Sequence, residues 1–314
     1  HTKGVEITTG PLGQGLASAV GFAYAQRYMR GLFDPESPVG ASPFDHYVYC
    51  IASEGDVQEG VTAEASALAG HQELGNLIVL WDRNHISIEE DTDVAFTEDV
   101  PARYRAYGWD VQRVDWIKTG NYVEDVQELY NAIERAKTVT DKPSFIEVRT
   151  IIGYPAPNKQ NTGSVHGSKL GAEEIVETKK VLGFDPEKSF FIEDEVLAHT
   201  RELRERGAAA HKVWNEKFEA WAQANPERAK LYNRLVSGEM PVDYKAAFPV
   251  FEPGTSLATR AASGKVINAI ADTFPELLGG SADLAGSNLT TINNAESFNP
   301  VSHSTEDWTG NPYG

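Results

Sequence analysis

Two short polar segments, thirty residues apart, could together hold a divalent cation. Glu54 lies in the segment Ser-Glu-Gly-Asp at 53–56, directly after one predicted strand, and Asn84 follows the next predicted strand. In an open parallel sheet, the loops at the carboxyl ends of neighbouring strands converge on one crevice. A carboxylate, an amide oxygen, a backbone carbonyl and diphosphate oxygens are the ligands that Mg²⁺ prefers. The structural alternative is that Asp56 caps the following helix while Asn84 only ends a strand.

A glycine-rich loop is the second segment that could bind a ligand. The sequence Thr-Thr-Gly-Pro-Leu-Gly-Gln-Gly at 8–15 opens directly into a predicted helix. Glycines let the backbone approach a ligand closely, and the free N–H groups at a helix start favour an anion. The loop has neither the dinucleotide-binding register nor the Gly-Lys-Ser/Thr of a P-loop. Taken alone, the glycines are equally explained by a tight turn packed under a helix.

The elements that must position these segments alternate between strands and helices. Apolar runs predict strands at 47–52, 76–82, 109–114 and 143–149. Helical spacing of apolar residues predicts helices at 13–30, 57–69, 98–107 and 123–136. Four strands with helical crossovers indicate an α/β fold, a doubly wound and mostly parallel sheet.

The second half of the chain changes character. An irregular segment rich in Pro, Asn, Gly and Ser covers 153–171, and loops of that length are usually functional or disordered. Charged helical segments follow at 195–222 and 225–235, and a Pro-punctuated linker covers 240–256. A second α/β unit is expected to start near Ala258, with a helix at about 259–273 and a strand at 276–280.

Composition narrows the possible functions. The formal net charge of −18 argues against a nucleic-acid interface, which needs clustered Lys and Arg. No apolar run approaches the roughly 20 residues of a membrane-spanning helix. The single cysteine, Cys50, lies in a predicted strand and supports neither a disulfide framework nor a thiolate metal site, so a cytoplasmic setting is expected. Neither His1 nor Gly314 reads as a natural terminus, so we expect a piece of a longer protein.

The spacing of these motifs resembles that of transketolases, especially those of actinobacteria. A Gly-Asp-Gly followed about thirty residues later by Asn is the thiamine diphosphate motif of the family. Similar segments run in one order along the chain, at 58–60, 64–70, 74–78, 103–109, 150–154, 164–167, 258–260 and 279–290. The resemblance implies a thiamine-diphosphate-binding PP domain core at 1–171, a helical extension and linker at 172–257, and an incomplete Pyr domain at 258–314.

The resemblance assigns the cofactor to the two segments described first. It implies that thiamine diphosphate lies along Gly10 and Leu12 and beside Gly55. The metal, Mg²⁺ or Ca²⁺, would be held by Glu54, by the Asn84 side chain and by the Ile86 carbonyl. Asn84 would thus serve both the cofactor and the metal.

The resemblance also assigns roles to five residues outside those segments. His166 would be catalytic and would contact both the diphosphate and the substrate, although a histidine beside glycines in a loop is often simply solvated. Asp283 would contact the cofactor, and Arg260 and Ser287 would bind the substrate phosphate. Glu59 would join the proton network between the two cofactor sites of a homodimer, or would be an ordinary exposed glutamate at a helix start.

One position departs from the family pattern. Where transketolases have Gly-Asp-Gly, this chain has Ser53-Glu54-Gly55, so the metal carboxylate is one methylene longer. Mg²⁺ tolerates little distortion of its octahedron, which predicts weakened metal and cofactor binding. Asp56 is a second possible donor, but its register places it at the start of a helix.

The implied activity is that of a transferase in the pentose phosphate pathway. The intact protein is expected to move a two-carbon ketol unit from a ketose phosphate to an aldose phosphate, while this piece alone is expected to be inactive. One alternative is another thiamine-dependent enzyme, of the dihydroxyacetone or deoxyxylulose phosphate synthase type. A second alternative, supported by Glu54, is a non-catalytic relative that keeps the fold.

Overall fold

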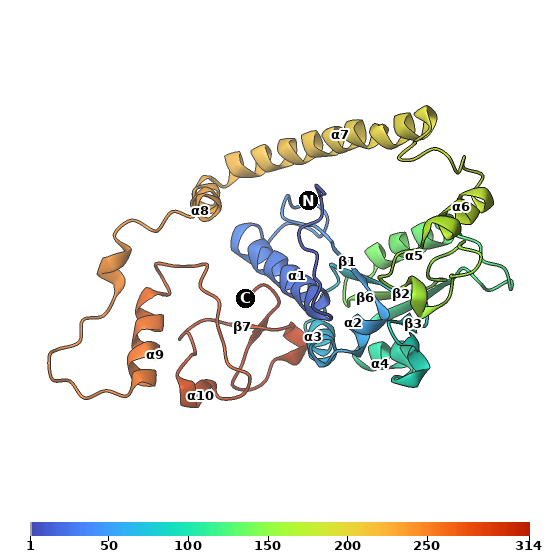
Figure 1. The fold of residues 1–314 in the computed structure, drawn as a ribbon. Coiled ribbons are helices and arrows are strands. Elements are labelled where there is room, and N and C mark those ends of the chain that lie inside the picture. The colour runs from blue at the N-terminus through green and yellow to red at the C-terminus, as the bar shows by residue number, and fades with distance from the viewer. Residues whose placement is uncertain (1) are drawn as a thin grey trace. The chain divides into compact units, whose positions relative to one another are not determined.

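The computed structural model of the protein describes residues 2–314, which group into two compact units (Figure 1). The first unit comprises the chain up to Gln26 together with His46–Gly207, and the second comprises Arg27–Asp45 together with Ala208–Gly314. The elements of the first unit, of which α1 and α7 continue into the second, are α1 (Gln14–Phe33), β1 (Val48–Ala52), α2 (Glu54–Gln58), α3 (Gly60–His71), β2 (Leu77–Arg83), β3 (Ile86–Ser87), β4 (Glu90–Asp91), α4 (Val100–Ala106), β5 (Asp110–Asp115), α5 (Val126–Thr138), β6 (Ser144–Arg149), α6 (Ala172–Val181) and α7 (Asp194–Ala224).

A four-stranded parallel sheet forms the centre of the first unit, in the order β1-β2-β6-β5. All four strands were expected from the sequence, and the parallel α/β fold is confirmed. Ala52 at the end of β1 pairs with Trp81 of β2, and Asp82 pairs with Val148 of β6. The carboxyl ends of these strands therefore meet at one edge of the sheet.

Alternating side chains of the sheet contribute to two separate cores, one on each face. On one face, Leu77, Val79 and Trp81 of β2 pack with residues of α1, α3 and α4. On the other face, Ile78 of β2 packs with residues of β5, β6 and α5. Figure 1 shows α4 and α5 on opposite sides of the sheet. The doubly wound arrangement thus follows from the continuous apolar run Leu-Ile-Val-Leu-Trp at 77–81.

Helix starts in this unit are set by side chains that accept backbone hydrogen bonds. Asp99 caps α4 by accepting from Ala102 N at 3.0 Å, and Asp125 caps α5 by accepting from Glu128 N at 2.9 Å. α5 also ends with Arg135 and Lys137 in its last turn, where positive charge complements the helix dipole. These caps explain why both helices begin later than the apolar pattern alone predicts.

Two local features differ from the sequence-based expectation. The helix expected at 57–69 is interrupted at Glu59, whose extended backbone (φ −72°, ψ 139°) separates α2 from α3. A hairpin of β3 and β4 follows β2 and was not expected, because its two strands are only two residues long. Both features lie at the carboxyl edge of the sheet and change how the loops there are presented.

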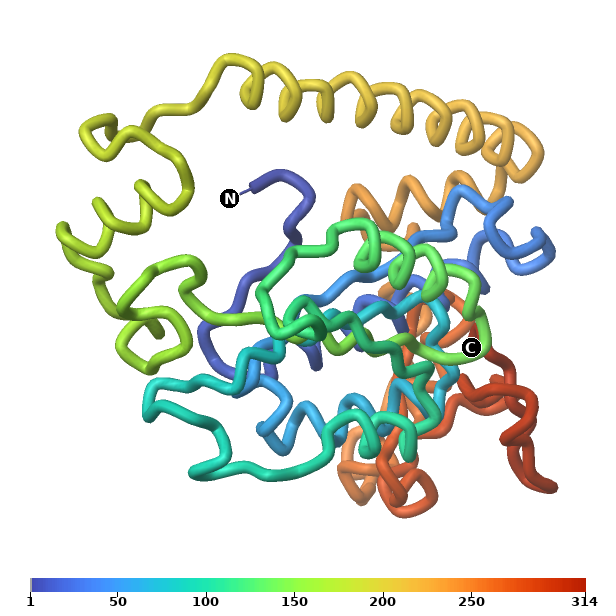
Figure 2. The backbone as a smooth tube through the Cα atoms, turned by 90° about the vertical axis from the view of Figure 1, so that its right-hand side faces the viewer, coloured from blue at the N-terminus to red at the C-terminus, as the bar shows by residue number. Residues whose placement is uncertain are grey.

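The second unit contains the C-terminal parts of α1 and α7, followed by shorter elements. These are α8 (Pro226–Ser237), α9 (Thr259–Ile270), α10 (Ala285–Asn288), β7 (Ser297–Phe298) and β8 (Gly310–Asn311). Figure 2 shows α7 as one unbroken coil, in agreement with the charged helix expected at 195–222. None of the helices in residues 2–314 has the length and apolar character required to cross a membrane.

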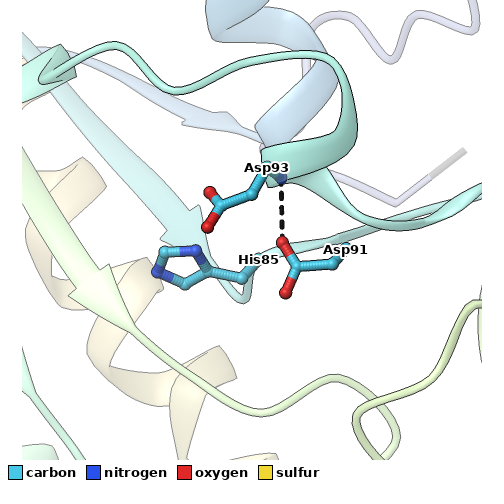
Figure 3. Close-up of side chains that lie close together, drawn as sticks. All are labelled: His85, Asp91 and Asp93. Atoms are coloured by element: carbon cyan, nitrogen blue, oxygen red, sulfur yellow. Dashed lines mark hydrogen bonds between the residues drawn. The ribbon is translucent and has the colours of Figure 1, made fainter.

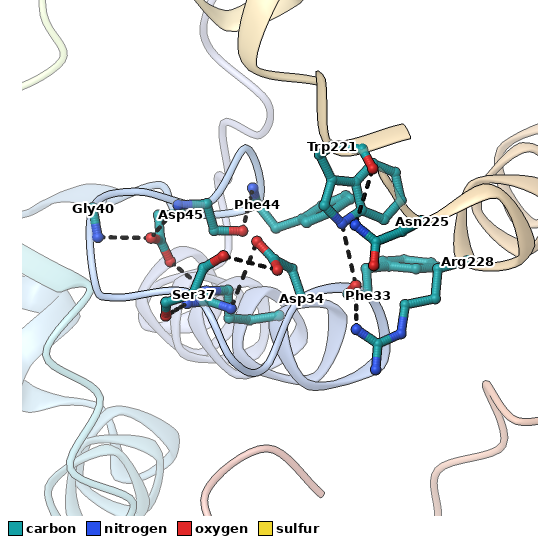
Figure 4. A network of polar contacts seen from close by, with 11 residues as sticks. Phe33, Asp34, Ser37, Gly40, Phe44, Asp45, Trp221, Asn225 and Arg228 are labelled. Carbon is teal, nitrogen blue, oxygen red and sulfur yellow. Dashed lines mark hydrogen bonds and ion pairs between the residues drawn. The ribbon is translucent and has the colours of Figure 1, made fainter. Parts of the chain in front are cut away.

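An aromatic cluster forms the core of the second unit (Figure 4). Phe44 packs edge-on against Trp221 with ring centroids 4.7 Å apart, and Phe33 lies 5.0 Å from Phe44. The Phe33 carbonyl, at the end of α1, accepts hydrogen bonds from Trp221 Nε1 at 3.3 Å and from Arg228 Nη1 at 3.2 Å. A carbonyl that no longer has a helical partner is thereby satisfied.

The prediction of a strand at 276–280 is wrong, since these residues are irregular in the structure. The apolar segment Leu-Leu-Gly-Gly has no neighbouring strand to complete its backbone hydrogen bonds, which a strand requires. Its position is held instead by Glu276, which accepts two hydrogen bonds from Arg234 of α8, at 2.9 and 2.7 Å. The expected helix beginning at Thr259 is confirmed and ends at Ile270.

Phe145 of β6 gives the sharpest test of the packing on the α4 face. It is fully buried, and its ring stacks on Tyr104 with centroids 3.8 Å apart. Phe145→Ala is expected to lower the free energy of unfolding by about 3–5 kcal/mol, because a large buried cavity would remain. Phe190→Ala is the matched control, since Phe190 is fully exposed and its loss should cost less than about 0.5 kcal/mol. Denaturant unfolding measures both values, and equal effects of the two changes would contradict this packing.

Candidate functional site

The tips of β1 and β2 lie together and join the two polar segments. Glu54 begins α2 directly after β1, and its Oε1 accepts a hydrogen bond from the backbone N–H of His85 at 2.6 Å. Glu54 and Asn84 are each only 6% exposed. A carboxylate and an amide are thus buried side by side at the carboxyl edge of the sheet, where ligands bind in open α/β folds.

Asn84 and Ile86 form a tight turn at the end of β2. Asn84 Oδ1 accepts from Ile86 N at 2.9 Å, and Asn84 Nδ2 lies 3.3 Å from Asp82 Oδ2. Asp82 also accepts a hydrogen bond from Thr150, directly after β6. These contacts fix which way the Asn84 amide points, because its nitrogen faces Asp82 and its oxygen faces the turn. A cation with oxygen ligands would find the amide oxygen already oriented.

The glycine-rich loop is attached to the same edge of the sheet. Gly13 N, just before α1, donates to Asp56 Oδ1 at 2.7 Å. Asp56 Oδ2 accepts from Ser53 N at 2.8 Å, and Ser53 Oγ in turn accepts from Asp56 N at 3.4 Å, which makes a capping box at the start of α2. Ser53 is therefore the N-cap of α2, and Asp56 is its partner at the third helical position and does not cap the following helix α3. Asp56 also holds the glycine-rich loop.

Leu12 of this loop packs directly on Gly55. A Cβ added to Gly55 would lie 2.9 Å from Leu12 Cδ1, so any larger residue at position 55 would have to displace the Leu12 side chain. Gly10 is exposed and has open space around it. The sequence-predicted cofactor residues Leu12 and Gly55 are thus in contact, and Gly10 lies in the same loop two residues before Leu12.

Burial and the neighbouring polar groups have opposite effects on the pKa of Glu54. Burial raises the pKa of Glu54, while the His85 N–H and the nearby Arg83 guanidinium oppose that rise. Burial also lowers the pKa of His85, and Arg149 and Arg83 lower it further. Arg83 is itself paired with the buried Glu147. In the absence of a cation, the charged form of Glu54 is therefore disfavoured by its surroundings.

A second group of potential metal ligands lies on the hairpin (Figure 3). Ligand atoms of His85, Asp91 and Asp93 lie within 4.8 Å of one another, and both aspartates are exposed. Asp91 Oδ1 already accepts from Asp93 N at 2.8 Å, which caps a short 3₁₀ turn. Exposed acidic groups that cap turns have a sufficient structural explanation, so no metal site is assigned to this cluster.

His166 lies in the loop between β6 and α6. It is exposed and follows a 3₁₀ turn at Gly163–Val165, where its N–H donates to the Gly163 carbonyl at 3.0 Å. The start of this loop is fixed by Glu174 of α6, which accepts from Asn158 N at 2.7 Å and from Lys159 N at 3.0 Å. The Asn158 side chain also donates to Glu174 and has the largest effect on its pKa. Together with the two backbone hydrogen bonds, it holds the pKa of Glu174 below its usual value.

The remaining predicted residues lie at exposed positions. Arg260 is in the first turn of α9, Ser287 is in α10, and Asp283 precedes α10. α9 and α10 approach closely, since a Cβ on Gly264 would lie 2.8 Å from the Leu289 carbonyl. These three residues belong to the second unit, whereas Glu54, Asn84 and His166 belong to the first. Glu59, between α2 and α3, is also exposed.

Two residues of the edge were not identified from the sequence. Asp82 orients the Asn84 amide, and Glu90 accepts a hydrogen bond from Gly163 N in the His166 loop at 2.8 Å. The position of Asp82, two residues before Asn84 at the end of a strand, was a usable signal. Glu90 gave none, because its partner lies 73 residues away along the chain.

Comparison with known proteins places this chain in a family. Residues 1–241 match the family described as transketolase, thiamine diphosphate binding domain. The transketolase of Mycobacterium bovis is 58% identical over 315 residues, spanning 100% of this chain and 44% of that protein. The transketolase of Geobacillus stearothermophilus is 46% identical over 304 residues, spanning 96% of this chain and 44% of that protein.

Solved structures agree with the sequence comparison. A transketolase of Pichia stipitis in complex with sedoheptulose 7-phosphate superimposes with a TM-score of 0.88 at 40% identity, over 98% of this chain and 44% of that one. The transketolase of Campylobacter jejuni gives a TM-score of 0.79 at 38% identity, over 42% of its own chain. The present chain spans less than half the length of these relatives.

The parallel α/β sheet together with the family match over residues 1–241 identifies a thiamine diphosphate binding domain. The match to the family covers more than two thirds of the residues of this chain. The alignment with the transketolase of Mycobacterium bovis covers the whole chain. The chain belongs to the transketolase family.

Because the pKa of Glu54 is raised, its negative charge is predicted to lower the free energy of unfolding of the metal-free protein in a pH-dependent way. Because the folded-state pKa lies above the unfolded one, this cost is absent below about pH 4.3 and grows as pH rises through the folded-state pKa. Glu54→Gln is therefore expected to unfold at a higher temperature than the wild type at neutral pH, and this advantage should vanish toward pH 4. Glu64→Gln, at an exposed position of α3, controls for net charge. Thermal unfolding across pH measures the difference, and a pH-independent difference would contradict the buried charge.

Proposed function

We propose that the polypeptide carrying this chain is a transketolase, which transfers a two-carbon ketol unit from a ketose phosphate to an aldose phosphate. The proposal rests on membership of the family and on one geometric observation. That observation is the hydrogen bond between Glu54 and the backbone of His85, which joins the tips of β1 and β2 at 2.6 Å. These tips carry the two halves of the family's thiamine diphosphate motif.

The residues at this edge are chemically suited to thiamine diphosphate and a divalent metal. Glu54, the Asn84 oxygen and the Ile86 carbonyl are proposed to hold Mg²⁺ or Ca²⁺, which prefer oxygen ligands. Gly55 lets the Leu12 side chain pack directly on the start of α2, since a Cβ at position 55 would lie 2.9 Å from Leu12 Cδ1. Gly10, with open space around it, is proposed to let the cofactor approach the backbone.

Thiamine diphosphate, when bound, supplies the carbon nucleophile and the electron sink of the reaction. The chain's own residues bind, orient and move protons around it. His166 is proposed to donate a hydrogen bond toward the diphosphate and toward the substrate oxygen on which negative charge develops. Asp283 is proposed to contact the cofactor. Arg260 and Ser287 are proposed to bind the substrate phosphate, where a planar guanidinium meets two oxygens at once.

A homodimer is part of the proposal. Glu59 is exposed in the single chain, and it is proposed to become buried between two subunits as part of a proton network. The exposed side of the edge strand β1, with Tyr49 and Ile51, offers apolar surface of the kind that is usually covered by a partner. A cytoplasmic location and sugar phosphates as substrates complete the proposal.

Residues 1–314 alone are proposed to be inactive, because family members draw further catalytic groups from regions that this chain does not match. Measurable ketol transfer by residues 1–314 alone would contradict this point. A dihydroxyacetone or deoxyxylulose phosphate synthase activity remains the alternative. Assays with matched pairs of ketose and aldose phosphates separate it from ketol transfer.

Asn84→Ala in the whole polypeptide gives the direct test of the metal site. The variant removes an oriented oxygen ligand and is expected to weaken Mg²⁺-dependent binding of thiamine diphosphate at least about tenfold, within the range known for metal-site residues. Isothermal titration with fixed Mg²⁺ measures the affinity. Asn131→Ala on the exposed side of α5 is the matched control and should bind as the wild type does. Equal affinity in the Asn84 variant would refute the assignment.

Glu54→Asp tests whether the longer carboxylate weakens the metal site. Mg²⁺ holds its ligands at about 2.1 Å in a nearly ideal octahedron, so the shorter side chain is expected to tighten Mg²⁺ binding several-fold. A Mg²⁺ titration at saturating thiamine diphosphate measures the change, with Glu89→Asp on the nearby exposed turn as control. An unchanged Mg²⁺ affinity would show that the extra methylene is harmless.

A further inference from the structure

The first residue of β4, directly after the turn of the β3–β4 hairpin, is a strained glutamate. Glu90 has a φ of +87°, in the left-handed region that residues with a side chain rarely adopt. It pairs with Ser87 across the hairpin, and Ile86, whose carbonyl is a proposed metal ligand, pairs with Asp91. Strain of this kind persists only where surrounding contacts impose it, and it gathers at functional sites.

A hydrogen bond of the Glu90 side chain accounts for the strain. Glu90 Oε2 accepts a hydrogen bond from Gly163 N at 2.8 Å. The Gly163 carbonyl accepts in turn from His166 N at 3.0 Å. Two consecutive hydrogen bonds therefore lead from the hairpin to the backbone of His166.

The two segments also touch closely at this point. A Cβ added to Gly163 would lie 3.0 Å from both the Glu90 nitrogen and the Ile88 carbonyl. Only a glycine allows the backbone of the His166 loop to approach the hairpin this closely. The contact thus depends on both segments, on a glycine in the loop and on the carboxylate at the start of β4.

We propose that Glu90 is a positioning residue, which fixes the His166 loop on the hairpin that carries Ile86. Through this contact, Glu90 sets where His166 lies relative to the proposed metal and diphosphate site. This inference rests on the proposed function, because that function gives His166 its role.

The stability of the hairpin turn itself does not account for a glutamate at position 90. Glu90 is exposed, and the loop is already anchored at its other end by Glu174, through Asn158 and Lys159. Glycine would adopt a φ of +87° without strain, so the stability of the turn alone favours glycine at this position. What only a side chain provides here is the hydrogen-bond acceptor for Gly163.

Three variants separate the backbone from the carboxylate. Glu90→Gly relieves the strain and removes the acceptor. Glu90→Gln keeps the strain and retains an oxygen that can accept from Gly163 N. Glu89→Gln, at the neighbouring exposed position, is the control for charge.

The first readout is amide hydrogen exchange of residues 159–167 in metal-free protein. Exchange in this segment is expected to accelerate at least fivefold in Glu90→Gly and to stay near the wild-type rate in Glu90→Gln and Glu89→Gln. The unfolding temperature of Glu90→Gly should stay close to that of the wild type, because relief of the backbone strain offsets the loss of the acceptor for the buried Gly163 N–H. General destabilisation does not produce faster amide exchange at 159–167 without a lower unfolding temperature.

The second readout is the affinity of the whole polypeptide for thiamine diphosphate at fixed Mg²⁺. Glu90→Gly is expected to weaken it several-fold, and Glu90→Gln to restore most of it. Unchanged exchange at 159–167 in Glu90→Gly overturns the inference, and so does unchanged cofactor affinity despite faster exchange. Failure of the wild type to bind thiamine diphosphate overturns the proposed function instead, and the exchange result then decides alone whether Glu90 holds the loop.

Discussion

The parallel pairing of β1 with β2 is the constraint on which the site depends. Because the two strands run in the same direction, the residues that follow each of them emerge at one edge of the sheet. Glu54 and His85 can then form a hydrogen bond although they are 31 residues apart in the chain. An antiparallel arrangement would place position 54 at the opposite edge from position 84, and no shared ligand would be possible.

Side chains that accept backbone hydrogen bonds convert this meeting of strand tips into a fixed frame. Asp56 holds Gly13 of the glycine-rich loop, Asp82 holds the Asn84 amide, and Glu90 holds Gly163. Each contact joins a loop to the sheet edge through a carboxylate, whose hydrogen bonds are stronger than those between neutral groups. The abundance of acidic residues in this chain therefore has a local use at the edge of the sheet, besides its general contribution to solubility.

The burial of Glu54 is unfavourable for the metal-free fold and favourable for a bound cation. Burial raises the pKa of Glu54, and only part of that effect is offset by the His85 N–H and Arg83. A protein selected for stability alone would replace such a group by a neutral one. A conflict between local stability and retained chemistry is what a functional site is expected to show.

The sequence predicted the sheet well because its strands are continuous apolar runs separated by helical patterns. It also predicted that positions 54 and 84 would meet, since that follows from strand direction alone. It failed at 276–280, where an apolar segment finds no neighbouring strand, and at Glu59, where one helix became two. The hairpin after β2 was missed because Glu90, directly after the turn, stands in place of the glycine or asparagine that usually marks a positive φ. Contacts such as Glu90 to Gly163 depend on tertiary structure and leave no pattern along the chain.

Crystallography of the whole polypeptide with Mn²⁺ and thiamine diphosphate, using the anomalous signal of the metal, tests the central claim most directly. The account predicts one strong peak bonded to Glu54, Asn84 Oδ1 and the Ile86 carbonyl, together with two diphosphate oxygens. A peak between His85, Asp91 and Asp93 instead, with no metal at the tips of β1 and β2, would contradict it.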